Sequence, residues 1–225
     1  MTRHPSILVC MPTMGFVRIE TMKSMALMFS FFGENKLAGN PLSQRLALAS
    51  VEGSMLCAQR EMLVKKALQS KHVTHILFVD SDMDFPMNLI HRLFVHDKVY
   101  IAANCTTRAE PPLPVAHDLA GNRLHSKGKS GLEQVTHVGL AVALIQTEPL
   151  KALRPPLFLM DWIPEQKTYC GEDVYFSQKL VEQGHEIWID HDVSQQVKHI
   201  GTKAYTHEQT VEGIEYDTQK LEKAA

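Results

Sequence analysis

Cysteines are few in this sequence, and no two of them lie close together. There are four, and none forms a Cys-x-x-Cys pair, which argues against a zinc ribbon and against a disulfide framework. They are Cys10, Cys57, Cys105 and Cys170.

Long apolar runs are also missing. No stretch approaches the ~20 consecutive apolar residues of a membrane-spanning helix, and the first residues lack the order of a signal peptide. We therefore expect a cytoplasmic protein with no membrane span. The sequence does not predict its oligomeric state.

Positive charge is not in excess. The net charge is −2, so the chain lacks the global basic field expected for tight, non-specific binding of nucleic acid. Its 225 residues are 44% hydrophobic and 21% charged, which is the balance of a globular protein with one sizeable core. We expect a single domain over 1–225.

The most informative stretch is 75–86, where a buried strand runs directly into acidic residues. The apolar run 76–79 predicts the strand, and Asp80, Ser81 and Asp82 follow it. Ligands of open α/β sheets bind beyond the carboxyl ends of the strands, and carboxylate oxygens suit Mg²⁺ or Mn²⁺. The stretch therefore predicts a site for a cation and a phosphate. The alternative is structural, because Asp and Ser also form turns and helix caps.

An EF-hand loop beginning at Asp80 is a poorer interpretation. Phe85 stands where that loop needs glycine, and His91 stands where it needs glutamate.

The first half of the chain alternates strands and helices, which predicts a mostly parallel sheet flanked by helices. The predicted strands cover 6–11, 45–51, 76–79 and 99–103. The predicted helices cover 21–32, 54–70 and 86–96, and a turn is expected at 39–41. The helical spacing of apolar residues predicts that Met22, Met55 and Met62 face the core. Arg60 has two interpretations, a pocket at the strand ends or a surface ion pair.

The second half is less regular. An edge strand is expected at 115–118, a mobile loop or hairpin tip at 118–131, and a strand pair or one bent strand at 134–147, with Gly139 at a bulge or close approach. Trp162 is assigned to the core rather than to a sugar site. We then expect a helix from Glu172, a strand over 186–190 and an extended piece over 193–200. A peripheral tail follows them.

Several motifs occur in a characteristic order over residues 6–201, and the sequence thereby resembles glycosyltransferases of the GT-A fold, close to the family-2-like group. The motifs are Met11-Pro12-Thr13 at the end of the first strand, Gln59-Arg60 in a helix, Asp80-Ser81-Asp82, Gly171-Glu172-Asp173 before a helix, and Lys198-His199-Ile200-Gly201.

The resemblance implies a divalent cation that carries the diphosphate of a UDP-sugar. Asp82 would ligate the cation directly, and Asp80 would contact it through water or contact the ribose. His199 would be the third contributor, and its imidazole suits Mn²⁺ better than Mg²⁺. The nucleotide pocket would be lined by Pro12, Thr13, Arg60 and Ser81.

The resemblance also implies the catalytic groups. In inverting members, an acidic residue at the position of Asp173 takes the proton of the acceptor hydroxyl, and Glu172 orients the acceptor or the base. In a retaining enzyme Asp173 would contact the donor sugar instead. The nucleotide-binding half would cover 1–104, the acceptor half 105–201 and a tail 202–225.

Other functions stay open at this point. A nucleotidyltransferase would usually carry a glycine-rich basic loop after the first strand, and 12–16 has one glycine. A non-catalytic nucleotide or carbohydrate-binding protein is the other alternative. The acceptor would be a glycan, a small molecule or hydroxymethylated pyrimidines of DNA. Binding of DNA would need a local basic face on the protein. Candidates for that face are Arg108, Arg123, Lys127 and Lys129.

Overall fold

The fold is built on a mixed central sheet. The computed structural model describes residues 5–35, 45–165, 167–201 and 204–210, and within these residues seven strands form that sheet. Its order is β2-β1-β3-β7-β5-β10-β6, in which only β7 and β6 run against the others. The strands are β1 (Ser6–Thr13), β2 (Arg45–Glu52), β3 (His75–Val79), β5 (Tyr100–Ala102), β6 (Leu132–Val135), β7 (Val142–Gln146) and β10 (Ile187–Asp190). The predicted α/β class with a mostly parallel sheet is confirmed.

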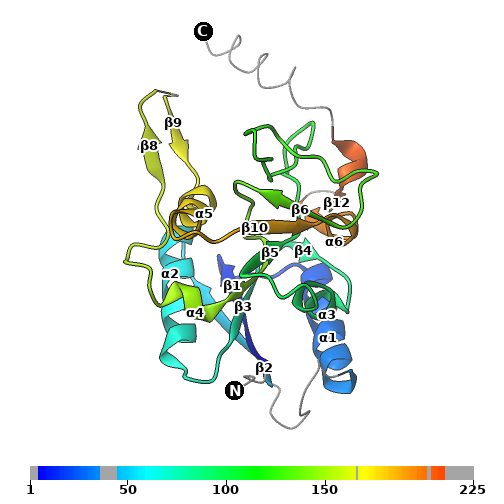
Figure 1. The fold of residues 1–225 in the computed structure, drawn as a ribbon. Coiled ribbons are helices and arrows are strands. Elements are labelled where there is room, and N and C mark those ends of the chain that lie inside the picture. Colours follow the sequence, from blue (N-terminus) through cyan, green and yellow to red (C-terminus); the bar gives the residue numbers. More distant parts are fainter. Residues whose placement is uncertain (1–4, 36–44, 166, 202–203, 211–225) are drawn as a thin grey trace.

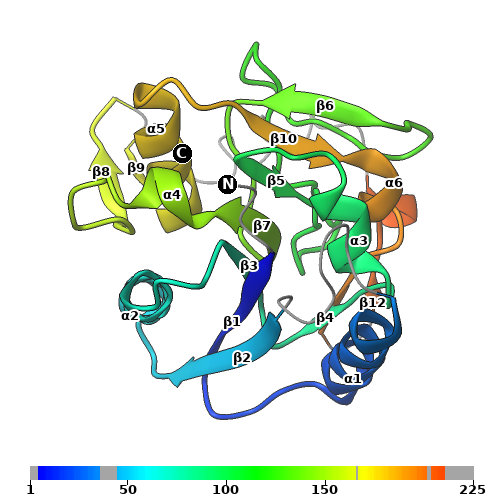
Figure 2. The same cartoon turned by 60° about the horizontal axis from the view of Figure 1, so that its bottom comes forward.

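Helices cover both faces of this sheet, as Figures 1 and 2 show from two directions. One face carries α2 (Leu56–Gln69), α4 (Thr147–Leu150) and α5 (Glu172–Glu182), and the other carries α1 (Ile19–Glu34), α3 (Leu89–Phe94) and α6 (His191–Ser194). Successive side chains of a strand point to opposite faces. On β3, Ile76 and Phe78 therefore pack in the core under α2, while Leu77 and Val79 pack in the core under α1.

Two small antiparallel sheets complete the described structure. One contains β4 (Met83–Asp84), β11 (Lys198–Ile200) and β12 (Ala204–Tyr205), and the other is the hairpin of β8 (Asp161–Ile163) and β9 (Thr168–Cys170). In the first, His199 lies opposite Met83. This pairing brings the late part of the chain beside the residues that follow β3, and the predicted antiparallel C-terminal part is confirmed.

The inward face of α2 differs from the prediction. Met55 and Met62 were expected in the core, but they are 69% and 57% exposed. The buried positions include Gln59 and Arg60 instead. The periodicity argument placed apolar residues inside, whereas this helix turns a polar pair inward because both side chains have partners there. Met22 of α1 is likewise exposed.

Trp162 is not a core residue, as the sequence had suggested. It lies on β8, is 47% exposed and meets Tyr169 of β9 edge to face, with ring centroids 5.1 Å apart.

The prediction of an extended segment over 193–200 is wrong for its first residues. There α6 forms, with Asp190 as its N-cap accepting a hydrogen bond from the Val193 backbone N–H.

Three other predicted elements differ in extent or in pairing. The helix expected over 86–96 is shorter, because α3 begins only at Leu89. The stretch 134–147 gives two strands in different places, with β7 between β3 and β5, and β6 at the sheet edge. At 115–118 the chain makes only isolated bridges, through His117.

Some expectations fall on residues that the structure does not describe. They include the turn at 39–41 and all of the tail except 204–210. In the described ranges, no helix is long and apolar enough to cross a membrane. The division into a nucleotide half and an acceptor half stays a prediction.

Gln59 fastens α2 to the ends of two strands. Its amide nitrogen lies within hydrogen-bonding distance of three backbone carbonyls, those of Thr13 (2.6 Å), Gly53 (3.0 Å) and Val51 (3.2 Å). The Gln59 side chain is buried, so its amide group holds the start of α2 against the ends of β1 and β2.

We expect Gln59→Ala to lower the free energy of unfolding by about 2 kcal/mol, because it removes the hydrogen bonds that a buried side chain makes to the ends of both strands. Urea denaturation measures the loss. Gln178→Ala, at an exposed position of α5, is the control and should change the free energy of unfolding by less than about 0.5 kcal/mol. Equal stabilities of the two variants would contradict the role of Gln59.

Candidate functional site

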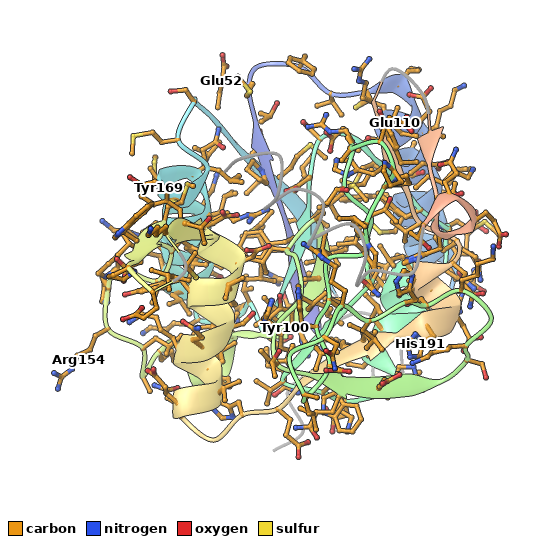
Figure 3. All side chains as sticks on the ribbon, turned by 90° about the horizontal axis from the view of Figure 1, so that it is seen from above. Glu52, Tyr100, Glu110, Arg154, Tyr169 and His191 are labelled. Carbon is orange, nitrogen blue, oxygen red and sulfur yellow. The ribbon has the colours of Figure 1, made fainter. Side chains whose placement is uncertain are left out.

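A buried arginine joins two acidic residues at the edge where the parallel strands end. Arg60 of α2 is 2% exposed. Its Nη2 atom lies 3.0 Å and 3.2 Å from the carboxylate oxygens of Asp80, the first residue after β3. Its Nη1 atom donates to Glu172, the first residue of α5. Figure 3 shows the molecule from this side, on which β1 and β2 also end.

This arrangement engages Arg60 within the protein, and its predicted contact with a nucleotide stays a prediction. The guanidinium was predicted to face a nucleotide, but both of its terminal nitrogens are engaged with carboxylates. Burial alone would lower the pKa of Arg60, and the charges of Asp80 and Glu172 outweigh burial and raise it. The side chain therefore stays charged and fixes β3 relative to α5.

Asp82 and His199 face each other across the β4–β11 pairing. Oδ2 of Asp82 lies 3.4 Å from Nε2 of His199. The other ring nitrogen, Nδ1, lies 2.7 Å from the carbonyl of Thr106, to which it donates because a carbonyl can only accept. Burial would lower the pKa of His199, but the bond to Asp82 raises it above its ordinary value. Burial would raise the pKa of Asp82, but His199 and Arg108 lower it.

The chemistry of this pair fits a divalent cation completed by substrate. Because Nδ1 of His199 is fixed on a backbone carbonyl, Nε2 is directed at the carboxylate of Asp82, as in histidines that bind metals. In the part of the chain that the structure describes, no three His, Cys, Asp or Glu side chains gather into a full metal site, and Asp80 lies with Arg60 instead. The protein would thus supply two ligands. Mg²⁺ is commonly held by one or two carboxylates plus phosphate oxygens and water.

Pro12, Thr13 and Ser81 shape the neighbouring loop mainly through turn and backbone contacts. Pro12 is buried at the end of β1. The hydroxyl of Thr13 donates to the Phe16 carbonyl at 2.7 Å. The carbonyl of Ser81 accepts from the backbone N–H of Arg18 at 2.9 Å, which ties the acidic loop to the start of α1.

Asp173 lies beside Glu172 at the N-terminus of α5. Burial raises the pKa of both carboxyl groups, and the nearby Arg60 charge opposes this rise. A carboxyl group with a raised pKa is better suited to accept a proton near neutral pH. A Cβ atom at Gly171 would lie 2.6 Å from Oδ1 of Asp173, so the glycine that precedes the two acids makes room for the catalytic candidate.

Gly139 is a second close approach, as predicted. A Cβ atom there would lie 3.1 Å from a methyl carbon of Val115 and 3.6 Å from Oδ2 of Asp173. The turn before β7 thus borders the carboxylate of Asp173.

Arg108 is the site residue whose place the sequence did not predict. Its Nη1 lies 2.8 Å from Oδ2 of Asp82. It had been considered only as part of a basic face, and no local pattern indicates a contact with position 82. The other members of that face have separate partners: Arg123 donates to the Pro114 carbonyl, Lys127 pairs with Glu208, and Lys129 pairs with Glu133.

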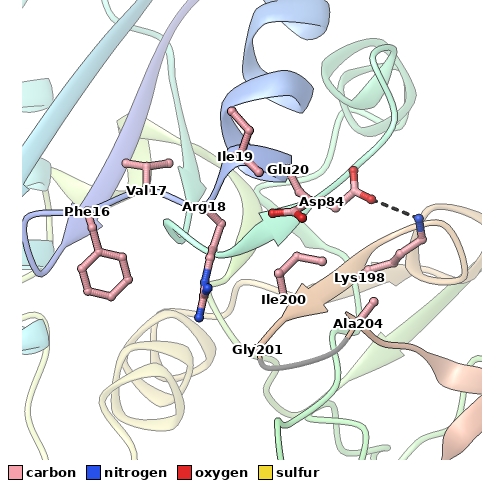
Figure 4. A pocket seen from close by; sticks show the side chains of 10 residues that line it. All are labelled: Phe16, Val17, Arg18, Ile19, Glu20, Asp84, Lys198, Ile200, Gly201 and Ala204. Atoms are coloured by element: carbon pink, nitrogen blue, oxygen red, sulfur yellow. Dashed lines mark hydrogen bonds and ion pairs between the residues drawn. The ribbon is translucent and has the colours of Figure 1, made fainter.

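A cavity of about 560 Å³ lies next to this site, between the start of α1 and β11 (Figure 4). Asp84 and Lys198 line it and form an ion pair at 3.0 Å. Because side chains alternate along strands, this pair faces the opposite side of the β4–β11 ladder from His199. The side chain of Arg18 extends away from the ion pair in Figure 4.

No protein-family model and no curated protein matches this sequence. Solved structures do match it in shape. The crystal structure of A197 from STIV has a TM-score of 0.60 and 16% identity, with 92% of each chain covered. GalNAc-T7 with UDP, GalNAc and Mn²⁺ has a TM-score of 0.48 and 12% identity, covering 89% of this chain and 44% of that one. The catalytic domain of Drosophila β1,4-galactosyltransferase 7 with xylobiose has a TM-score of 0.48 and 15% identity, covering 88% and 71%.

These comparisons bear on the fold. At 16% identity, the likeness to A197 shows a shared architecture, and the two lower scores support no further argument. The chain has an α/β fold with a mixed, mostly parallel central sheet, and A197 shares this architecture. What its site does has to be argued from its own residues.

We expect Arg60→Met to lower the free energy of unfolding by about 3 kcal/mol at pH 8 and by less at pH 5. The substitution removes the charge that lowers the pKa of Glu172, so burial raises that pKa further above its unfolded value. A carboxyl group with a raised folded-state pKa costs stability progressively as pH rises through its unfolded pKa. Urea denaturation at both pH values measures the difference.

Arg154→Met is the matched control, because Arg154 is exposed and projects from the surface (Figure 3). It should cost the same small amount at both pH values. A loss for Arg60→Met that is equal at pH 5 and pH 8 would show that Arg60 does not compensate a buried carboxylate.

Proposed function

We propose that this protein is a metal-dependent glycosyltransferase that moves a sugar from a UDP-sugar to an acceptor hydroxyl. The observation that carries the proposal is the convergence of Asp82 and His199, 3.4 Å apart, at the edge where β3 ends. Asp173 is tied to the same edge through its neighbour Glu172 and Arg60. A cation-binding pair and a candidate base are what a metal-dependent, inverting transfer from a nucleotide-sugar uses.

The donor end of the reaction belongs to Asp82 and His199. A divalent cation bound there would stabilise the negative charge that develops on the diphosphate as it leaves. A mixed nitrogen and oxygen ligand set favours Mn²⁺ over Mg²⁺. By the resemblance in motifs, the uridine would lie toward Pro12 and Thr13. Asp80 would then act through Arg60 rather than as a direct ligand.

The acceptor end belongs to Asp173. The acceptor oxygen attacks the anomeric carbon, the bond from that carbon to the diphosphate breaks, and the acceptor proton passes to the carboxylate. Glu172, held by Arg60, fixes the start of α5 and thereby the position of Asp173. This assignment corresponds to inversion at the anomeric carbon. A retained configuration in the product would instead assign Asp173 to a contact with the donor sugar.

A glycan or a small molecule is the acceptor class that we favour. DNA as acceptor would need several basic side chains that act together on phosphates. Arg108, Lys127 and Lys129 each pair with a different acidic residue, Asp82, Glu208 and Glu133 respectively. This pairing of the basic side chains with separate acidic residues argues against a surface that binds nucleic acid.

We expect Asp82→Ala to abolish turnover and to weaken binding of UDP with Mn²⁺, and Asp173→Asn to keep that binding but slow transfer by about 100-fold or more. The first change removes a cation ligand, and the second removes the proton acceptor. Release of UDP from a UDP-sugar and calorimetric titration with UDP measure the two effects.

Asp84→Asn is the control for Asp82→Ala, because Asp84 is an acidic residue two positions away that pairs with Lys198 and Ser24. Its turnover should stay within about threefold of the parent. Unchanged binding of UDP and Mn²⁺ to Asp82→Ala would contradict the proposed site.

A panel of nucleotide-sugars with Mn²⁺ and no acceptor distinguishes the remaining classes. A glycosyltransferase should hydrolyse its donor slowly, releasing the free sugar and the nucleoside diphosphate. Consumption of a nucleoside triphosphate and a sugar phosphate, with release of pyrophosphate, would identify a nucleotidyltransferase. Binding without any turnover would identify a non-catalytic binding protein.

A further inference from the structure

The loop 105–115 contacts both side chains of the candidate cation site. A hydrogen bond from the Thr107 backbone N–H to the Leu113 carbonyl, at 2.8 Å, closes it. The carbonyl of Thr106 accepts the bond from Nδ1 of His199 at 2.7 Å. The loop therefore orients one of the two cation ligands.

Two residues further on, Arg108 covers the other ligand. Its Nη1 atom lies 2.8 Å from Oδ2 of Asp82, the same oxygen that faces Nε2 of His199 at 3.4 Å. The oxygen that a cation would use thus already has a cationic partner. Asp82 keeps only 15% of its side chain exposed, whereas Arg108 keeps 49%.

The structure gives the stem of Arg108 a defined place. A Cβ atom at Gly201, the residue after β11, would lie 2.8 Å from Cε2 of Tyr205 and 3.2 Å from Cδ of Arg108, so the glycine leaves room for both side chains. The side chain as a whole is half exposed, so water reaches it while it contacts Asp82.

We propose that Arg108 competes with the divalent cation for Oδ2 of Asp82, and that the diphosphate of the donor relieves this competition by binding the displaced guanidinium. The inference rests on the proposed function. A cation between Asp82 and His199 repels a second positive charge beside it. A diphosphate offers Arg108 the bidentate oxygen pairing that guanidinium groups prefer.

A coupling between the two ligands follows from this exchange. Before the donor binds, the cation has to displace Arg108 from Asp82 with no new partner for the arginine. After the donor binds, that partner is present. UDP should therefore tighten the binding of Mn²⁺, and Mn²⁺ should tighten the binding of UDP by the same factor.

The experiment compares the parent protein with Arg108→Gln, which keeps the shape of a polar side chain and loses the charge. Electron paramagnetic resonance of free Mn²⁺ measures binding of Mn²⁺ with and without UDP. Without UDP, we expect the variant to bind Mn²⁺ about fivefold more tightly, as the loss of one partly exposed ion pair implies. The further tightening by UDP should be smaller in the variant than in the parent.

Lys198→Gln is the matched control. Lys198 is 47% exposed, adjoins His199 in sequence and pairs with Asp84 rather than Asp82, so its removal takes away the same charge from the same neighbourhood. It should change the binding of Mn²⁺ by less than about twofold. Arg108→Lys keeps a charge near Asp82 and should stay close to the parent.

The outcomes separate this inference from the proposed function. If the parent protein binds Mn²⁺ and UDP, and Asp82→Asn loses that binding, the site is correct. Unchanged Mn²⁺ affinity in Arg108→Gln, or equal tightening in Lys198→Gln, would then overturn the competition alone. A parent protein that binds neither Mn²⁺ nor UDP would overturn both. If UDP binding depended on Arg108 but not on Mn²⁺, the guanidinium alone would neutralise the diphosphate. That result would contradict the proposed competition between Arg108 and the metal.

Discussion

The site depends on one buried positive charge. Arg60 is almost fully removed from solvent, and a buried guanidinium is tolerable only when it is paired. Its partners, Asp80 and Glu172, come from the end of β3 and the start of α5, so a single side chain fixes two elements that lie far apart in the sequence. Without this charge, Asp80, Glu172 and Asp173 would repel one another at the same edge of the sheet.

The other charged groups take their positions from this bridge. Asp82 follows Asp80 by two residues, and the pairing of β4 with β11 brings His199 to it from late in the chain. Asp173 follows Glu172 at the start of α5. The acidic residues thus divide into two kinds: Asp80 and Glu172, which Arg60 neutralises, and Asp82 and Asp173, for which we propose roles in binding a cation and accepting a proton.

The sequence predicted the parts that local pattern determines. The apolar run of β3, the acidic residues behind it and the alternation of strands and helices follow from periodicity and residue chemistry. Trp162 was wrongly assigned to the core, because nothing in its own segment shows that, within the described residues, β8 and β9 pair only with each other. The burial of Arg60 and the contact between Arg108 and Asp82 depend on residues far away in the chain, and a single sequence does not show those distances.

The most direct test of the account is the position of a bound cation. Crystals grown with MnCl₂ and UDP, measured at the manganese absorption edge, would locate it by anomalous scattering. The account predicts a peak between Oδ2 of Asp82 and Nε2 of His199, in contact with the diphosphate oxygens. A peak away from both side chains, or UDP bound with no peak beside Asp82, would contradict it.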